Sequence, residues 1–408
     1  MNRQKILIGI GLVGVAVLIG AAIYFMFFRA VPAPTPTPPP RELIPINAPP
    51  ILPPTTALPP GAFPTTAGAP TITPEMSAPS AIAAGGRTAT TALTDGTAQF
   101  LRIAADGPRY YDPNAQGFFR LGSDGKPIAL SKRQFPNVQS VAWSPDGERA
   151  IVEFPDGANV SINFRLDDQV TLPQHWEDFS FAPNGERIAG KNIGLDRENQ
   201  SLFEADPDGN AFRAVESLGS NARKVIVSWS PNEQVVAFSR TGNDLGDGRQ
   251  QILLIGKNNE NFPGLTVQGT DFRPLWSPSG ARIIYSAVDA SNDYKPELWS
   301  VDGVGDSIGA NRRRLGVNTW ADRCTFADDV TVYCTVPDGL IHGAGLVPSV
   351  ADNTPDSIER IDLRTGASSI VGRPDRDMTI RDLRISTDGA KLYFTANDDG
   401  RLYEIRLR

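Results

Sequence analysis

The chain has 408 residues, and its apolar and charged fractions of 40% and 21% are typical of a protein with a sizeable core. Its formal net charge of −7 argues against a nucleic-acid partner, which would need a basic surface. Two cysteines and two histidines leave little material for a zinc site or for catalysis by histidine, so we expect no metal and no cofactor.

An uncharged, mainly apolar run at residues 6–28 follows a short N-terminal tip, residues 1–5, that carries Arg3 and Lys5. As a helix the run would be about 34 Å long, enough to cross a hydrocarbon core of about 30 Å. A cleaved signal peptide is the alternative, but the aromatic end of the run at residues 24–28 is a poor cleavage context. We therefore expect a single-pass signal anchor with a cytoplasmic N-terminus, and a chain that continues in the periplasm or at the cell surface.

A segment rich in proline, threonine and alanine follows at residues 29–86. It is nearly uncharged and has few large apolar side chains, so it cannot bury enough surface to fold by itself. Its prolines favour the extended polyproline II conformation. We interpret the segment as a linker that spaces a domain from the membrane; a proline-rich ligand for another domain is the alternative.

A turn motif, typified by Trp143-Ser144-Pro145-Asp146-Gly147, recurs along the rest of the chain. Proline presets φ, aspartate can bond its own backbone, and glycine supplies a positive φ, so the motif indicates a tight turn between two strands. Successive copies start 38 to 59 residues apart, and a period of roughly 40–50 residues is typical of a propeller blade. The seven copies begin at Ile103, Trp143, Phe181, Trp229, Trp276, Phe326 and Ile385.

The last repeat ends after its third strand, at residues 402–407, which would leave an exposed strand edge. Residues 88–93, ahead of the first repeat, are suited to fill the missing outer position. The sequence therefore predicts an all-β fold over residues 87–408: a seven-bladed β-propeller, with six blades as the alternative, closed by its N-terminal strand.

The Trp-Ser-Pro-Asp-Gly turn and the strand that follows it resemble the WD-repeat-like propeller repeat of TolB and its relatives. The resemblance covers residues 87–408 and implies the propeller fold, which hosts many unrelated activities. TolB-type proteins have an α/β domain before a six-bladed propeller, whereas this chain has an apolar run, a linker and seven motif copies. The resemblance therefore describes a membrane-anchored, TolB-like propeller.

The recognition surface follows from propeller topology, because loops between the second and third strands of a blade share a face with the segments entering the next inner strand. Length variation falls largely in those loops, at 192–200, 241–250, 288–297 and 336–357, and variable loops on a rigid scaffold usually carry binding. We expect a ring of charges and tryptophans around the channel mouth on this face, or charges that merely pair and cap the channel. The candidates are Trp176, Glu177, Asp178, Arg273, Trp320, Asp322, Arg323, Arg381 and Asp382.

Cys324 and Cys334 flank the sixth turn symmetrically, so they would face each other on neighbouring strands. Opposed β carbons lie about 4.5–5.5 Å apart, close to the spacing that a disulfide needs. Oxidising conditions outside the cytoplasm favour a disulfide over a buried reduced pair.

These features predict a non-enzymatic binding or scaffold module that engages a protein or an envelope polymer through the loop-rich face. The alternative is an enzyme or a small-ligand or glycan binder that uses the polar channel mouth. Gly305-Asp306-Ser307-Ile308-Gly309 matches a nucleophile elbow only formally, since it lacks the strand-turn-helix context. Asp-rich turns at 206–209 and 397–400 could hold calcium, but most such pairs simply make turns.

Overall fold

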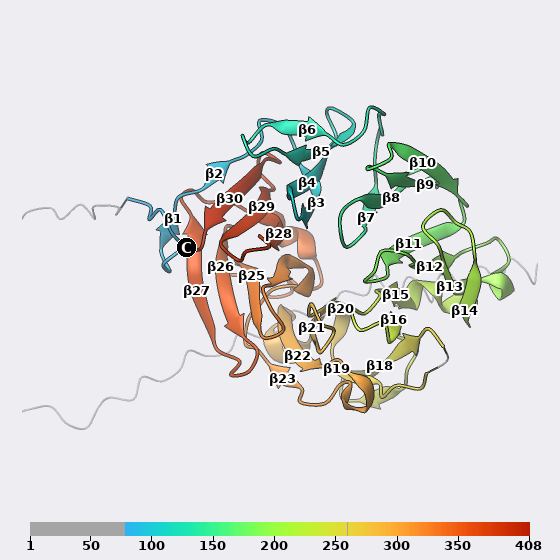
Figure 1. Ribbon diagram of the computed structural model, residues 1–408. Helices are drawn as coiled ribbons and strands as arrows, with labels where there is room; N and C mark the ends of the chain where they lie inside the picture. Colours follow the sequence, from blue (N-terminus) through green and yellow to red (C-terminus); the bar gives the residue numbers. More distant parts are fainter. Residues whose placement is uncertain (1–77, 259) are drawn as a thin grey trace, which may run out of the picture. The chain divides into compact units, whose positions relative to one another are not determined.

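Seven small antiparallel sheets form the blades of a β-propeller in the computed structural model, which describes residues 78–258 and 260–408 (Figure 1). The predicted all-β fold and its seven blades are confirmed. Among the described residues, no helix is long and apolar enough to cross a bilayer. The predicted membrane span at 6–28 and most of the predicted linker lie outside those residues.

Each blade has an inner strand nearest the ring centre, two middle strands and an outer strand. The inner strands are β3 (Gln99–Ala104), β7 (Ser140–Trp143), β11 (Trp176–Phe181), β15 (Val225–Val227), β20 (Thr270–Trp276), β24 (Cys324–Phe326) and β28 (Ile380–Ile385). The second strands are β4 (Gly107–Asp112), β8 (Arg149–Glu153), β12 (Ile188–Asn192), β16 (Val235–Ser239), β21 (Arg282–Val288), β25 (Thr331–Pro337) and β29 (Lys391–Ala396).

The third strands are β5 (Gly117–Leu121), β9 (Asn159–Asn163), β13 (Ser201–Ala205), β18 (Arg249–Gly256), β22 (Pro296–Asp302), β26 (Asp356–Asp362) and β30 (Leu402–Arg406). The outer strands are β6 (Pro127–Ala129), β10 (Asp168–Leu172), β14 (Arg213–Ser217), β19 (Leu265–Gln268), β23 (Arg313–Arg314), β27 (Ser368–Pro374) and β2 (Thr91–Ala92). Blade 4 has an extra short strand, β17 (Asp244–Gly246). The connections contain short 3-10 helices: η1 (Arg197–Asn199), η2 (Gly219–Lys224), η3 (Ala290–Asn292), η4 (Gly305–Ser307), η5 (Ala321–Arg323) and η6 (Pro348–Asn353).

The recurrent motif forms the turn between the inner and second strands. In blade 2, the amide of Gly147 donates to the carbonyl of Ser144 over 3.0 Å, and Gly147 has a φ of +74°. The Asp146 carboxylate accepts hydrogen bonds from the Ser144 hydroxyl at 2.5 Å and from the Glu148 amide at 2.9 Å. Short-range bonds thus close the turn, which explains why Ser, Asp and Gly recur there.

Blade 6 contains the decayed copy of this turn, at residues 327–329. Asp328 accepts from the backbone amides of Val330 and Thr331 at 2.8 Å, so an aspartate still closes the turn. Asp329 instead accepts from the amide of Ser279 in the preceding blade at 3.0 Å. The turn without the glycine is therefore still closed by an aspartate and still bonded to a neighbouring blade.

The N-terminal strand closes the ring, as predicted. Thr91 and Ala92 of β2 pair antiparallel with Glu404 and Tyr403 of β30, and the Leu93 amide donates to Leu402 over 2.8 Å. A short additional strand, β1 (Arg87–Thr88), pairs parallel with β27 of blade 6, a contact that the sequence did not indicate. The predicted strand at 88–93 is thus split between two blades, and one segment joins both sides of the seam.

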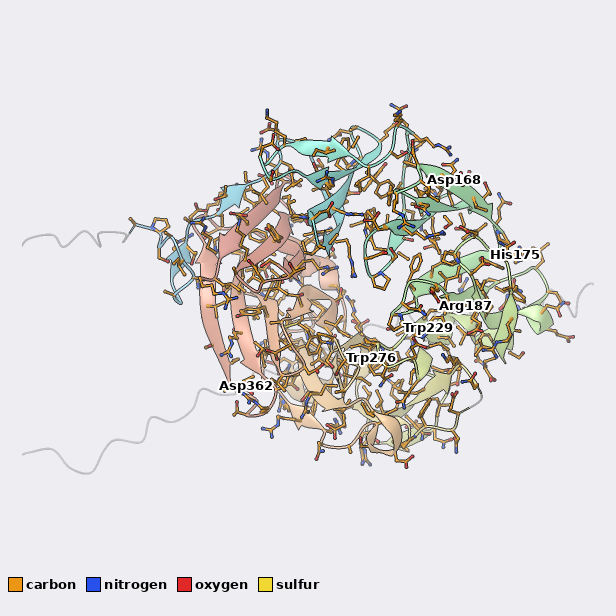
Figure 2. The ribbon with its side chains drawn as sticks, in the orientation of Figure 1. Asp168, His175, Arg187, Trp229, Trp276 and Asp362 are labelled. Atoms are coloured by element: carbon orange, nitrogen blue, oxygen red, sulfur yellow. A yellow bond between two sulfur atoms is a disulfide. The ribbon has the colours of Figure 1, made fainter. Side chains whose placement is uncertain are left out.

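Aromatic side chains fill the spaces between blades. The Phe118 ring of β5, which is fully buried, lies 5.5 Å from the Trp143 ring of β7 in an edge-on arrangement. Trp229 and Trp276 occupy equivalent repeat positions, are 6% and 8% exposed, and lie toward the middle of the ring (Figure 2). The motif aromatics therefore belong to the core, and their recurrence reflects packing.

The structure joins Cys324 and Cys334 in a disulfide between directly opposed residues of β24 and β25. Both residues are buried, at 2% and 0% exposure. The register predicted from the decayed turn is the register observed. The bond joins the two strands of the blade whose turn has lost its glycine.

Replacing both cysteines with alanine should lower the free energy of unfolding by about 2–3 kcal/mol, because the crosslink restricts the unfolded chain. Urea denaturation followed by tryptophan fluorescence measures this. A reductant should destabilise the natural protein by a similar amount and leave the Cys324→Ala/Cys334→Ala variant unchanged. Complete alkylation of the native protein without reductant would contradict the disulfide.

Candidate functional site

Six of the nine predicted site residues line one pocket of about 290 Å³ on the loop-rich face, the face that carries the loops between second and third strands. We call it the loop-face pocket; it is lined by Arg273, Trp320, Asp322, Arg323, Pro348, Ala351, Asp352, Thr379, Arg381 and Asp382. The residues come from blades 5, 6 and 7. Residues of a second-to-third loop and of segments entering inner strands share this pocket, as the topology argument predicted.

Three short elements position the pocket's charged groups. Arg273 lies on β20, Asp322 and Arg323 lie on η5, and Arg381 lies on β28. The opposite wall is η6 (Pro348–Asn353), which belongs to the long loop between β25 and β26. That loop had been identified by its length, but its role as a wall required the structure.

Aspartates with a positive φ mark bulges in three inner strands. Asp178, Asp271 and Asp382 have φ values of 56°, 53° and 49°, and the pairing register shifts around each of them. Aspartate tolerates this left-handed conformation better than most residues. A bulge adds one unpaired residue and redirects its neighbours. The sequence analysis missed these bulges, although each is an Asp followed by Phe or Leu.

Ion pairs engage the exposed charges of the pocket. Arg273 lies 3.0 Å from Asp271 and 3.2 Å from Asp322, and Arg381 lies 2.9 Å from Asp352. All these side chains are between about one third and three fifths exposed, so each pair contributes little to stability. In this pocket, the exposed charges pair with one another, as the alternative interpretation of the candidate residues expected.

A buried ion pair lies behind the pocket. Arg323 donates to Oδ2 of Asp356 over 2.6 Å, and the Ile380 amide donates to the same oxygen over 2.6 Å. The Asp356 side chain is fully buried, and its Oδ1 has no hydrogen-bond partner among the described residues. Burial raises the pKa of Asp356 to about 7, although the Arg323 guanidinium opposes that shift.

Trp320 forms an apolar wall of the pocket. It is 2% exposed, and the Arg273 guanidinium carbon lies 5.8 Å from the centroid of its ring. Its indole nitrogen is buried without a hydrogen-bond partner among the described residues. The indole nitrogens of the core residues Trp229 and Trp276 are likewise buried without a partner in the described part of the chain, so this feature alone does not indicate a ligand.

The remaining three candidates, all on β11 of blade 3, do not line this pocket. Trp176 is 5% exposed, and its ring centroid lies 4.1 Å from that of Phe203, so it is a core residue. Asp178 forms an ion pair with Lys191 and lines a separate hollow of about 460 Å³. Glu177 is exposed on the same strand and lines neither space.

An exposed apolar patch adjoins the pocket and was not identified from the sequence. The long β25–β26 loop docks on the β21–β22 loop through bonds from the Gly343 and Gly345 amides to the carbonyls of Asp293 and Tyr294, both 2.8 Å. We call the exposed apolar residues of the two loops the apolar patch: Tyr294, Ile341, Leu346, Val347 and Val350, with exposures of 38%, 64%, 58%, 53% and 37%. Contiguous exposed apolar side chains are typical of interaction sites.

Other chemistry considered from the sequence has no assembled site in the described chain. Residues 78–258 and 260–408 contain no group of three or more His, Cys, Asp or Glu side chains arranged to hold a metal ion. At the formal nucleophile elbow, the Ser307 hydroxyl donates to the carbonyl of Val304 over 2.7 Å. Asp206 and Asp399, in the two Asp-rich turns, accept hydrogen bonds from nearby backbone amides.

Comparisons with solved structures show the propeller fold and no closer relationship. The β-propeller domain of Cps50 (Swd1) from Myceliophteria thermophila aligns with a TM-score of 0.53 and 11% identity over 78% of this chain and 100% of that domain. Oligogalacturonate lyase from Vibrio parahaemolyticus gives 0.53 and 10% identity, over 78% of this chain and 93% of the lyase. Tricorn protease gives 0.51 and 12% identity, over 76% of this chain and 33% of the protease.

No protein family and no curated protein sequence matches the chain. The resemblance to TolB therefore extends to the propeller fold and not to a shown family. At 10–11% identity, the Cps50 (Swd1) propeller domain and the lyase have the same TM-score with this chain, and neither indicates an activity.

Proposed function

We propose that the protein is a membrane-anchored binding module whose propeller lies outside the cytoplasm and engages a protein or an envelope polymer through the loop-rich face. The observation that carries the proposal is the apolar patch beside the loop-face pocket. Two loops from neighbouring blades, docked on each other by backbone bonds, carry five exposed apolar side chains, and the pocket offers arginines and aspartates. Apolar contact surrounded by polar groups is the usual composition of a protein interface.

The backbone bonds that hold the long loop support a binding role for the apolar patch. The backbone bonds at Gly343 and Gly345 fix the loop, so its apolar side chains are held in place before a partner arrives. Preorganised loops lose less conformational entropy when they bind. The most accessible charged side chains of the loop-face pocket form ion pairs with one another. Paired charges suit the binding and orientation of a partner better than the transfer of a proton.

Site-specific photo-crosslinking in cells tests the proposal. A photoreactive residue at Val347 in the full chain should give a discrete crosslinked product, whereas one at Ile128, an equally apolar site that is 42% exposed on the outer strand β6, should not. The Leu346→Asp/Val347→Asp variant, with the photoreactive residue moved to Val350, should lose at least about 90% of the product. Its thermal stability should stay unchanged, since both side chains are exposed. Equal crosslinking from Val347 and Ile128 would contradict the proposal.

An enzyme or a small-ligand or glycan binder is the second candidate. It is favoured by the 290 Å³ loop-face pocket, whose lining combines the Trp320 ring with arginine and aspartate side chains. If this alternative holds, a Trp320→Phe variant should lose ligand binding while patch crosslinking persists.

A further inference from the structure

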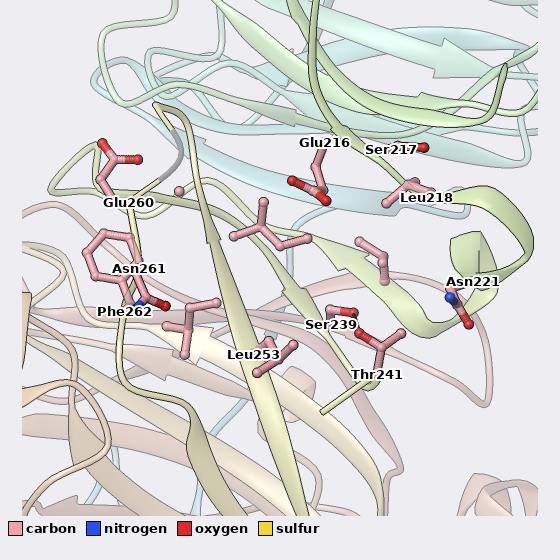
Figure 3. A pocket seen from close by; sticks show the side chains of 14 residues that line it. Glu216, Ser217, Leu218, Asn221, Ser239, Thr241, Leu253, Glu260, Asn261 and Phe262 are labelled. Carbon is pink, nitrogen blue, oxygen red and sulfur yellow. Dashed lines mark hydrogen bonds between the residues drawn. The ribbon is translucent and has the colours of Figure 1, made fainter. Parts of the chain in front are cut away.

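A second pocket, of about 360 Å³, lies between the outer strand of blade 3 and the side of blade 4 (Figure 3). Its lining comes from blades 3 and 4, whereas the loop-face pocket is lined by blades 5 to 7, and none of the nine predicted site residues lines it. We call it the rim pocket; its lining residues belong to β14, η2, β15, β16, β18 and the segment 260–262, with Leu218 and Thr241 from the connections.

The rim pocket exists because the outer strand of blade 4 is interrupted. β19 pairs with β18 only as far as Leu265, opposite Ile252. Beyond that point a single bridge joins Ile255 to Asn261. Pro263 lies between the two and has no N–H to donate to a strand ladder. The last residues of β18 therefore lack a continuous partner strand on this side, and the pocket lies beside them.

The lining combines an apolar surface with acidic groups. Leu218, Val225, Leu253, Ile255 and Phe262 supply the apolar surface. Two carboxylates, Glu216 and Glu260, lie on one side of the pocket, with Leu253 and the hydroxyls of Ser239 and Thr241 across from them in Figure 3. None of the lining residues is a lysine, an arginine or a histidine.

The two carboxylates differ in their surroundings. Glu216 forms no ion pair within the described residues, whereas the nearby cations Arg213 and Lys257 pair with Glu204 and Glu233 at 2.9 and 3.1 Å. Burial acts to raise the pKa of Glu260, but hydrogen bonds from Asn258 and the charge of Lys257 outweigh it and lower the pKa. Glu260 thus stays ionised at neutral pH with Lys257 and Arg213 acting on its charge, whereas Glu216 has no ion-pair partner among the described residues.

A free strand edge adjoins the pocket. β14 (Arg213–Ser217) pairs with β13 on one side and, in the described part of the chain, has no strand on its other side. Glu216 and Ser217 of this strand line the pocket. An extended peptide could add to such an edge by main-chain bonds and place one side chain in the neighbouring space.

We propose that the rim pocket binds an arginine or lysine side chain from an extended segment of a protein partner that pairs with β14. The carboxylates would meet the cation, while the apolar lining would contact the methylene stem that such side chains carry. This site shares no lining residue with the loop-face pocket or the apolar patch, and it would provide a second point of contact. The ligand class follows from the acidic and apolar lining and from the unpaired edge.

Fluorescence anisotropy with two labelled heptapeptides tests the site on the full chain in detergent. One peptide has threonine and alanine around a central arginine, and the other has citrulline there, which keeps the shape and removes the charge. The arginine peptide should bind at least about tenfold more tightly, a difference that charge-assisted hydrogen bonds readily give. Its affinity should fall as salt is raised.

Variants locate the binding. Glu216→Gln/Glu260→Gln should weaken the arginine peptide about tenfold and bring it to the citrulline level, whereas the exposed turn variant Glu186→Gln should have no effect. Ser217→Trp, at an exposed position of β14, should block the pocket without disturbing the core. The Leu346→Asp/Val347→Asp variant should bind the peptide normally, which separates this proposal from that for the loop-rich face.

Two results would overturn the inference. Equal binding of the arginine and citrulline peptides, or unchanged binding by both Glu216→Gln/Glu260→Gln and Ser217→Trp, would exclude a cation site here. If free arginine amide bound as tightly as the peptide, the β14 edge would have no part in recognition. Thermal unfolding of each variant verifies that it is folded before its affinity is interpreted.

Discussion

Deleting residues 87–93 from the full chain should open the propeller and cost most of its stability. The deletion removes β1 and β2 and with them the pairing of Thr91 and Ala92 to β30, as well as the bond from the Leu93 amide to Leu402. Leu402 and Ile405, which are fully buried, would lie behind an uncovered strand edge. With about 1 kcal/mol per lost hydrogen bond and the apolar area exposed, the loss is on the order of 5 kcal/mol. Typical domains have only about 5–15 kcal/mol in total.

Thermal unfolding and light scattering measure this effect. The deleted protein should unfold at a lower temperature and aggregate, since an unpaired β30 is a template for edge-to-edge association. A deletion of equal length at residues 66–72, in the predicted linker, is the matched control and should unfold like the natural protein. A synthetic peptide of residues 80–96 added during refolding should restore the transition. Unchanged unfolding of the 87–93 deletion would show that the seam is held by other contacts.

The stability difference between the natural protein and an Asp356→Asn variant should fall as the pH rises from about 4 to about 7. The folded-state pKa of Asp356 is about 7, raised from 3.8 by burial, so in this window the folded state holds a proton that the unfolded chain has released. The natural protein therefore loses stability as the pH rises, by roughly 1.4 kcal/mol per pH unit. The variant cannot titrate at this position, so it lacks this dependence.

Urea unfolding of both proteins at several pH values shows directly whether the stability difference falls or rises with pH. Asp388→Asn is the control, because hydrogen bonds from Ser386 and from the Ala390 amide lower the pKa of the exposed Asp388. The stability that ionised Asp388 contributes to the natural protein should therefore be present above pH 3.8 and be lost as the pH falls through the lowered pKa of this group. If the difference for Asp356 instead grew with pH, the attraction of Arg323 would outweigh burial, and the pair would be ionised throughout.

The recurring turn made the fold predictable, because its chemistry is local. Ser144, Asp146 and Gly147 close their turn with bonds to one another and to adjacent amides, so the motif keeps its spacing whatever surrounds it. The pairing of Cys324 with Cys334 was predictable for the same reason: register near a short hairpin turn follows from the turn itself. The closing strand was predictable because the last repeat lacked an outer strand.

Trp176 shows why part of the site was not predictable. It precedes Phe181 by five residues, an odd number, so regular alternation along a strand would place the two side chains on opposite faces. The bulge around Asp178 adds one residue to β11, and both Trp176 and Phe181 join the same core cluster. The bulge requires Asp178 to adopt a left-handed backbone conformation within the folded sheet. The local sequence does not determine that conformation. The apolar patch likewise depended on how two distant loops dock.

The way the ring closes also sets an order for its synthesis. β2 can pair with β30 only after β30 has been synthesised, and some 310 residues separate Ala92 from Leu402. At about 5–20 residues per second, a ribosome needs roughly 15–60 s to make them. During that time the closing strand has no partner, and its two small residues, Thr91 and Ala92, present a short and weakly adhesive edge. A chain whose synthesis stops before β30 therefore cannot close the propeller ring, because β2 then has no strand to pair with.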